Sequence, residues 1–336
     1  MITFIVRRLF GAALMLLVVS MVTFAVFFLV PRLAGQTTDQ LATQYVGRNP
    51  SPTQVHAMEV KLGLDQPIYV QYGRFLKGIV AGADYNDGPD VTHCPAPCFG
   101  YSFKNQQPVW PQMLNALPVT GSLALGAAVL WLVTGVGIGV LSALKRGSIF
   151  DRSAMSVALA GVSLPIFFTA LLSLAIFRDS VPLFPDAGNF IPFGQSPSRW
   201  AEALVLPWVT LAFLYAALYA RLTRAGMLET MNEDFIRTAR AKGLSERKVV
   251  VKHGLRASLT PIVTIFGLDL GLLVGGAILT ETAFSLPGLG RFAVNAITNQ
   301  DLPEILGVTL LAGFFVVLAN LIVDVLYAVV DPRVRY

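Results

Sequence analysis

The sequence predicts an all-α polytopic membrane protein with six transmembrane helices and both termini in the cytoplasm. Composition, the length of the apolar segments and the distribution of basic residues lead to this fold class. Of the 336 residues, 54% are hydrophobic and 13% are charged, whereas soluble domains carry about 25% charged residues. A soluble fold could not cover its surface with so few charges. Lipid is therefore the predicted solvent, and a cytosolic enzyme, a disordered regulator and a small disulfide scaffold are excluded.

Six segments are long enough to cross a bilayer, which takes about 20 mostly apolar residues. Their approximate ranges are 9–30, 117–144, 153–177, 202–225, 258–283 and 304–330. The first follows Arg7 and Arg8, as a signal peptide would, but its apolar run exceeds the roughly 7–15 residues of a signal-peptide core. We therefore expect an uncleaved anchor helix over 1–30, and a cleaved signal peptide is the alternative.

Basic residues set the orientation of these helices. If the N-terminus is inside, the inside segments hold 16 of the 25 Lys and Arg residues, and nine of those lie between Arg221 and Arg256. Such an excess of basic residues is typical of cytoplasmic loops. The chain then divides into the anchor, an extracytoplasmic loop region over 31–116 and a five-helix core over 117–336. Within the loop region, 53–62 and 68–80 have helical patterns.

One substantial cytoplasmic segment, 231–257, reads as two short helices joined by a glycine turn. Asn232 suits the N-cap of the first helix, and Gly243 suits the left-handed residue that ends it. Ser245 can cap a second helix that leads into the fifth span. The segment is therefore expected to form a compact element attached to a membrane helix.

The first of these helices is amphipathic. Phe235, Ile236 and Ala239 share an apolar face, and basic residues occupy most of the other face. An apolar helix face of this kind can dock in a groove on a soluble partner. The alternative is a basic loop that only fixes topology or touches lipid headgroups.

Polar and small residues inside the predicted spans have two interpretations each. Asp269 lies at mid-membrane, where an ionisable group is costly and faces protein or water. It is either a polar residue of a translocation pathway or a hydrogen-bond partner of a neighbouring helix. Glycines recur every four residues at 135 and 139 and at 267, 271 and 275. This spacing lets helices pack closely in lipid, and a role in contacting the substrate is the alternative.

The predicted outer side carries two further features. Cys94 and Cys98 flank a Pro-Ala-Pro sequence, and on an oxidising side of the membrane they can form a disulfide. Free thiols or metal binding are the alternatives, although two Cys and three His do not supply a Cys/His zinc framework. Pro287, Gly288 and Gly290 favour a tight turn between the last two spans, or an ordinary loop.

The cytoplasmic segment resembles the EAA loop of ABC-importer permeases, in which E-A-A is followed by three residues, G, nine residues and I-x-L-P. Aligned on Gly243, the E-A-A positions fall on Arg237, Thr238 and Ala239. Ala239, Gly243 and Leu255 agree with the pattern, whereas its leading Glu, its Ile and its Pro are absent. The local sequence RTARAKGLSE is similar to that of the peptide-transport branch of these permeases.

Longer stretches resemble the dipeptide/oligopeptide/nickel permease family, a group of binding-protein-dependent transport system inner membrane components. They are IVRRLF, LGLDQPIYVQYGRFLKG, ETAFSLPGLGRFAVNAITNQDLPEILG and LIVDVLYAVVDPRVRY. The similarity touches nearly the whole chain and is weakest around the insert-like region 84–109.

This resemblance implies a type I ABC-importer permease fold and a non-catalytic subunit in a bacterial or archaeal plasma membrane. The implied partners are a second homologous permease, two ATP-binding subunits and an extracytoplasmic solute-binding protein, with no nucleic acid. Because the sequence has no G-x-x-x-x-G-K-[ST] loop, ATP would be hydrolysed by the partner subunits, and no cofactor bound by this chain is expected. Di- or oligopeptides are the expected solutes, and nickel chelates or other small solutes are the alternative.

The resemblance also implies roles for particular residues. The expected ATPase-coupling residues are Phe235, Ile236, Arg237, Thr238, Ala239, Gly243, Leu244 and Leu255. The expected outer-gate or binding-protein-docking residues are Pro287, Gly288, Gly290, Arg291 and Asp301. A stand-alone secondary transporter or channel is the competing function, whereas the absence of H-E-x-x-H and G-x-S-x-G motifs argues against an intramembrane enzyme.

Overall fold

The computed structural model describes residues 2–46, 50–86, 91–181, 183–184 and 188–330. Arg48, Arg333 and Arg335, which entered the charge count above, lie outside the described residues. The α-helices in chain order are α1 (Ile2–Phe24), α2 (Val30–Leu33), α3 (Thr38–Thr43), α4 (Pro52–Leu62), α5 (Ile68–Ala81), α6 (Val109–Trp131), α7 (Gly137–Leu144), α8 (Ile149–Ser163), α9 (Ile166–Leu174), α10 (Pro197–Thr230), α11 (Asp234–Ala241), α12 (Glu246–Lys248), α13 (Arg256–Val274), α14 (Ile278–Ala283), α15 (Leu289–Thr298) and α16 (Leu302–Val330). Segments of π-helix join several of them, at Ala25–Leu29 (η1), Leu132–Val136 (η2), Ala175–Ser180 (η3) and Val249–Leu255 (η4).

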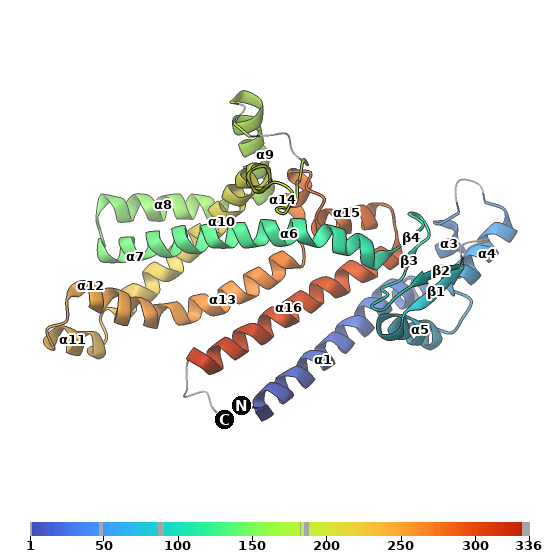
Figure 1. The fold of residues 1–336 in the computed structure, drawn as a ribbon, viewed down its shortest axis with the longest axis horizontal. Coiled ribbons are helices and arrows are strands. Elements are labelled where there is room, and N and C mark those ends of the chain that lie inside the picture. Colours follow the sequence, from blue (N-terminus) through green and yellow to red (C-terminus); the bar gives the residue numbers. More distant parts are fainter. Residues whose placement is uncertain (1, 47–49, 87–90, 182, 185–187, 331–336) are drawn as a thin grey trace.

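The molecule is elongated, and its long helices each cover part of its length, most of them inclined to the longest axis (Figure 1). The short helices α11 and α12 lie at one end, and α3, α4, α5 and the strands lie at the other. Helices α1 and α16 lie side by side, and their N- and C-terminal ends come close together. The two predicted extramembrane regions are thus at opposite ends of the helical body.

Among the described residues, four helical stretches are long and apolar enough to cross a membrane. They are Val6–Leu33, Val109–Leu144, Pro197–Thr230 and Leu302–Val323. Two bent pairs pass the same test together, so the chain has up to six spans. Ile149–Ser163 and Ile166–Ser180 meet at 102°, and Glu246–Leu259 and Pro261–Val274 meet at 52°.

Two predicted spans therefore need correction. The segment 153–177 is not one continuous helix, because Leu164 takes an extended conformation before Pro165. A residue before proline is disfavoured in helical geometry, which ends α8 there. The segment 258–283 is also interrupted, since α13 ends at Val274 and α14 starts separately at Ile278.

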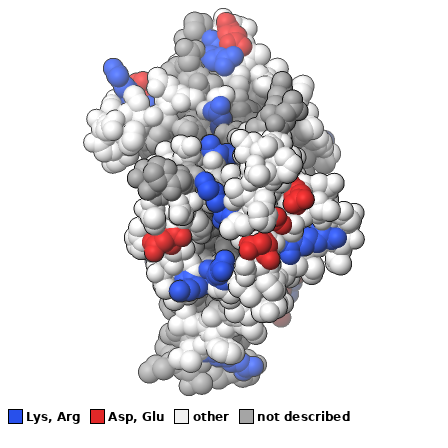
Figure 2. All heavy atoms as spheres, turned by 90° about the vertical axis from the view of Figure 1, so that its right-hand side faces the viewer, with Lys and Arg blue, Asp and Glu red and all other residues white. Residues whose placement is uncertain are grey.

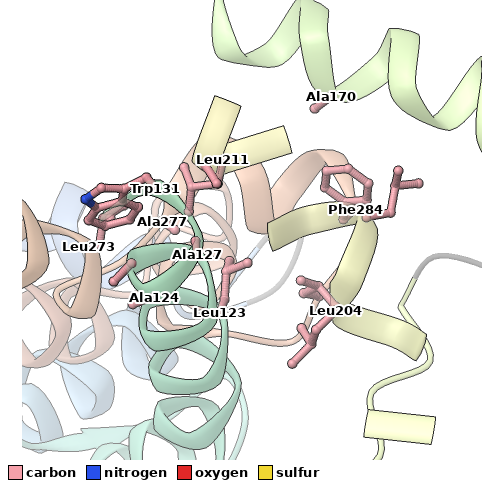
Figure 3. Close-up of a cluster of buried hydrophobic side chains, with 14 of the residues drawn as sticks. Leu123, Ala124, Ala127, Trp131, Ala170, Leu204, Leu211, Leu273, Ala277 and Phe284 are labelled. Atoms are coloured by element: carbon pink, nitrogen blue, oxygen red, sulfur yellow. The ribbon is translucent and has the colours of Figure 1, made fainter. Parts of the chain in front are cut away.

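The main hydrophobic core lies where α6, α9, α10, α13 and α14 meet. Figure 3 shows Leu123, Ala127 and Trp131 of α6 within this cluster, together with Leu211 and Leu273. Trp131 is fully buried, and its ring stacks on that of Tyr215 of α10 with centroids 4.6 Å apart. Lipid is as apolar as these side chains, so there is no hydrophobic driving force for the helices to associate. Close packing contacts of this kind hold the helices together instead.

Glycines permit the closest helix contacts. A Cβ at Gly139 would lie 2.5 Å from the Thr223 Cβ of α10, and a Cβ at Gly271 would lie 2.5 Å from the Ala319 Cβ of α16. Both distances are too short for a real contact. The prediction that these four-residue glycine repeats serve helix packing is confirmed.

The predicted loop region is a small folded lobe. Its two predicted helical stretches are confirmed as α4 and α5. The insert-like region forms two antiparallel hairpins, and one pairs β1 (Ala83–Asn86) with β2 (Val91–Cys94). The other pairs β3 (Tyr101–Ser102) with β4 (Gln107–Pro108). Cys94 and Cys98 are joined by a disulfide with Cα atoms 5.7 Å apart.

Candidate functional site

The candidate coupling element begins at α11. Its N-cap is Glu233, in extended conformation, and Asp234 occupies the first turn, where a negative charge complements the helix dipole. The prediction that Asn232 caps this helix is wrong. The Asn232 side chain instead donates a hydrogen bond to the Leu228 carbonyl at 2.8 Å, within the preceding turn.

The turn after α11 is built as the sequence indicates. Gly243 has φ +77°, so the left-handed residue predicted there is confirmed. Ser245 is the N-cap of α12, with Glu246 in its first turn. Arg240 of α11 donates two hydrogen bonds to the Glu246 carboxylate, at 2.7 and 3.2 Å, and so links the two helices across the turn.

The apolar face of α11 is divided between the protein interior and the surface. Ile236 is fully buried and Ala239 is 7% exposed, and both pack against Val249 of η4 and Met231. They hold α11 on its own chain. The expectation that these two residues share a docking face with Phe235 therefore needs correction.

The outward side of α11 keeps part of the predicted set. Phe235 is 46% exposed and Leu244 is also exposed. Arg237 is exposed and donates to Asp234 at 3.3 Å, while Thr238 donates its hydroxyl to the Asp234 carbonyl at 2.9 Å. An exposed phenyl ring beside charged groups is a surface that a soluble protein could contact.

The coupling element is joined to a membrane helix without a loop. From α12 the chain runs through η4 directly into α13. Leu255 at this junction packs beside Val250 and Met227, and a Cβ on Gly254 would lie 2.9 Å from the Met231 sulfur. A displacement of α11 would therefore be passed to α13 through tightly packed contacts.

Beyond the C-terminal end of α13, the predicted turn encloses a buried carboxylate. Glu281 of α14 is fully buried and accepts a hydrogen bond from the Thr120 hydroxyl of α6 at 2.6 Å. It also accepts from the Arg291 backbone N–H in the first turn of α15 at 3.0 Å. The Thr120 oxygen in turn accepts from the Leu289 N–H at 2.8 Å. The carboxylate thus joins α6, α14 and the start of α15.

The glycines of this turn are explained by that carboxylate and by the backbone of Ile278. A Cβ at Gly288 would collide with the Glu281 carboxyl group, and a Cβ at Gly290 would lie 2.6 Å from the Ile278 Cα. Pro287 is exposed at the tip. Sequence reasoning identified Pro287, Gly288 and Gly290 but missed Glu281 and Thr120. The signal that could have found Glu281 is an acidic residue preceding two closely spaced glycines at the end of a span.

The two charged residues predicted in this region have local partners. Arg291 donates to the Ser285 carbonyl of the same turn. Asp301 is 1% exposed and accepts from Ser102 of β3 at 2.5 Å. Burial raises the pKa of the Asp301 carboxyl, and the Ser102 hydrogen bond acts in the opposite direction. Asp301 therefore ties the β3 hairpin to the start of α16 and presents no exposed carboxylate to a docked protein here.

Asp269 has a neighbouring-helix partner. Its carboxylate accepts a hydrogen bond from the Tyr219 hydroxyl of α10 at 2.8 Å. Tyr219 is buried next to Trp131 in the main core. This contact matches the interpretation of Asp269 as a link between helices.

Taken together, the geometry is that of a multi-pass helical membrane protein with the short helices α11 and α12 at one end. Residues 135–336 match the family described as binding-protein-dependent transport system inner membrane component, and residues 1–124 match the N-terminal family of such membrane components. The chain belongs to the binding-protein-dependent transport system inner membrane component family, whose members are permease subunits of transporters. Membership implies ATPase and binding-protein partners.

Curated relatives cover the whole chain. A Brucella abortus (strain 2308) protein named as a peptide transport system permease is 40% identical over 332 residues, covering 99% of this chain and 98% of that protein. The dipeptide transport system permease protein DppB of Escherichia coli (strain K12) is 34% identical over 358 residues, covering 100% and 99%. The DppB protein of Alkalihalophilus pseudofirmus is 35% identical over 355 residues, covering all of both chains.

A solved structure shares the fold. The inward-facing MetNI methionine ABC transporter aligns with a TM-score of 0.53 at 20% identity, covering 66% of this chain and 97% of that one.

Proposed function

We propose that this chain is the transmembrane permease subunit of an ATP-driven importer for di- or oligopeptides. Its relatives are named as peptide or dipeptide transport permeases, and the similarity covers nearly the full length of both chains. In this proposal the chain lies in a bacterial or archaeal plasma membrane, spans it six times, counting each bent pair as one span, and has both termini in the cytoplasm. The basic residues around α11 and the apolar lengths of the spans support this arrangement.

The observation that carries the proposal is the construction of α11. Ile236 and Ala239 fasten the helix to the chain, Phe235 projects from it, and η4 joins it directly to α13. We propose that α11 docks on an ATPase subunit and that ATP-driven closure of two such subunits tilts α13. A ligand bound elsewhere can bias a two-state element in this way.

The remaining parts follow from the same proposal. A second homologous permease completes the pathway, an extracytoplasmic binding protein delivers the solute near the Pro287 turn, and this chain itself binds no cofactor. Asp269 is proposed as a polar residue near that pathway as well as a partner of Tyr219.

Co-purification tests this assembly. An affinity-tagged chain purified in mild detergent from its own host should retain a second permease and two ATPase subunits. A stand-alone transporter or channel, the competing function, would purify by itself and would transport solute without ATP.

A further inference from the structure

The outer lobe contains a cavity that the importer function does not use. It has a volume of about 630 Å³ and lies between α1, α4, α5, the two hairpins and the first turn of α16. These elements all lie at one end of the molecule (Figure 1), and Figure 2 views that end, with Lys and Arg side chains across its middle. Both α1 and α16 belong to candidate spans, so the cavity lies where membrane helices leave the bilayer.

One wall of the cavity is aromatic. Phe24 and Phe28 stack at 4.4 Å near the outer end of the first span, and Phe75 of α5 lies 6.0 Å from Phe24. A hydrogen bond of 2.9 Å between Ser20 and Tyr72 holds α5 against α1 at the same place. This wall gives the cavity an apolar surface of the kind that an acyl chain could contact.

The other wall is cationic. Among the described lining residues, Lys61, Arg74 and Lys77 are basic, and Asp84 is the one acidic residue. Arg74 and Lys77 are three residues apart on α5, so they share a face, and both are exposed. The Asp84 carboxylate oxygen lies 2.6 Å from His93 Nδ1, so this carboxylate already has a partner in the hairpin. The cavity therefore presents net positive charge beside an apolar wall.

This placement runs against the general charge pattern of the chain. Only nine of the 25 Lys and Arg residues fall on the predicted outer side, and three of those nine converge here. Basic residues at a membrane surface attract anionic headgroups, at about 1 kcal/mol per Lys or Arg.

We propose that this cavity binds one anionic phospholipid, with its phosphate at Arg74 and Lys77 and an acyl chain along Phe24 and Phe28. The lipid would fill the space between the first span and the lobe and so fix the lobe on the membrane. The ligand class follows from the pairing of a cationic wall with an aromatic one at the end of a span.

Native mass spectrometry tests the proposal on the assembled complex, purified from nanodiscs of equal parts phosphatidylglycerol and phosphatidylethanolamine. Wild type should retain phosphatidylglycerol in preference to phosphatidylethanolamine. The double variant Arg74→Gln with Lys77→Gln should weaken that retention about 30-fold, because it removes two basic side chains that each attract the headgroup. Because both side chains are exposed, the double variant should fold, which its thermal melting checks.

Two further arms make the result decisive. Arg199→Gln, an exposed basic residue on α10 outside the cavity, is the matched control and should leave retention unchanged. Soluble glycerol phosphate, added as a competitor, should fail to displace the lipid, because it lacks the acyl chain. Equal retention in the double variant and wild type would overturn the proposal. Displacement by glycerol phosphate, or by a soluble anionic peptide, would show a site for a soluble anion instead.

Discussion

At the scale of single residues, Glu281 organises the outer turn more than any residue of the turn itself. Its carboxylate accepts hydrogen bonds from two different elements, and the adjacent Gly288 leaves it the space to do so. Buried donors that lose their acceptor cost about 1–3 kcal/mol each. The turn is therefore stable only while this carboxylate is present.

Glu281→Ala should lower the free energy of unfolding by about 3 kcal/mol, because the Thr120 hydroxyl and the Arg291 N–H lose their acceptor. Glu281→Gln keeps one acceptor oxygen and should cost less. Thermal melting in detergent measures both. Thr282→Ala, at the exposed neighbouring position, is the control. If Glu281→Ala melts at the same temperature as that control, the carboxylate does not organise the turn.

A second residue-scale prediction concerns the contact between α13 and α16. Gly271→Ala should destabilise the protein by about 1–3 kcal/mol, since the new methyl group would overlap the Ala319 Cβ. Gly137→Ala is a matched control, because a Cβ there would meet open space among the described residues. Melting temperatures that fall equally, or do not fall, in the two variants would argue against close packing at Gly271.

The contacts of a residue could be predicted from the sequence where its spacing from similar residues alone defines its surroundings. The glycine repeats predicted close helix contacts because small residues four apart must lie on one helix face. The buried Glu281 was not predictable, because its partner Thr120 is 161 residues away and an acid near a turn usually lies in solvent. The burial of Ile236 was not predictable for a similar reason, since Val249, against which it packs, lies beyond the glycine turn.

At the scale of elements, α11 combines an anchored side with a presented side. The amphipathic pattern identified the helix but could not show which apolar residues its own chain covers. The effect of prolines on the helices could likewise not be predicted from the sequence alone. Pro165 breaks a predicted span, whereas Pro118 and Pro207 lie inside continuous helices. Whether a proline ends a helix depends on whether neighbouring helices hold its two sides in line, which sequence does not report.

Phe235→Ala should weaken binding of the ATPase subunit about 30-fold without changing thermal stability, because the exposed ring is the apolar anchor of the proposed contact. Retention of ATPase subunits on the tagged permease measures the effect. Tyr69→Ala removes an aromatic side chain that is even more exposed, at 77% against 46% for Phe235, and lies at the other end of the molecule, so this control should retain the ATPase subunits fully. Unchanged retention in Phe235→Ala would remove the phenyl ring from the proposed interface.

At the scale of the whole molecule, a folded lobe with α3, α4, α5 and the strands lies at one end of the helical body, and α11 and α12 lie at the other (Figure 1). The helical membrane fold class could be predicted from the apolar lengths along the chain, whereas six spans and their direction remain predictions. The division of the third and fifth spans into bent pairs depends on tertiary packing and did not follow from hydropathy.

Accessibility labelling tests the proposed orientation. A membrane-impermeant maleimide should label Tyr69→Cys in intact cells, and it should label Leu244→Cys only after permeabilisation. Both positions are exposed, so burial cannot explain a difference. The native Cys94 and Cys98 are bonded to each other and should stay unlabelled without reductant. The reverse pattern would place α11 outside and refute the orientation.

The most direct test of the central claim is dipeptide uptake by the reconstituted complex, with ATP enclosed in the vesicles and the binding protein outside. Wild type should accumulate labelled dipeptide only when both are present. Gly243→Pro should assemble with its ATPase subunits but abolish uptake, because proline fixes φ near −65° and cannot adopt the +77° found at this turn. Uptake that needs no ATP, or that is unchanged in an assembled Gly243→Pro complex, would contradict coupling through α11.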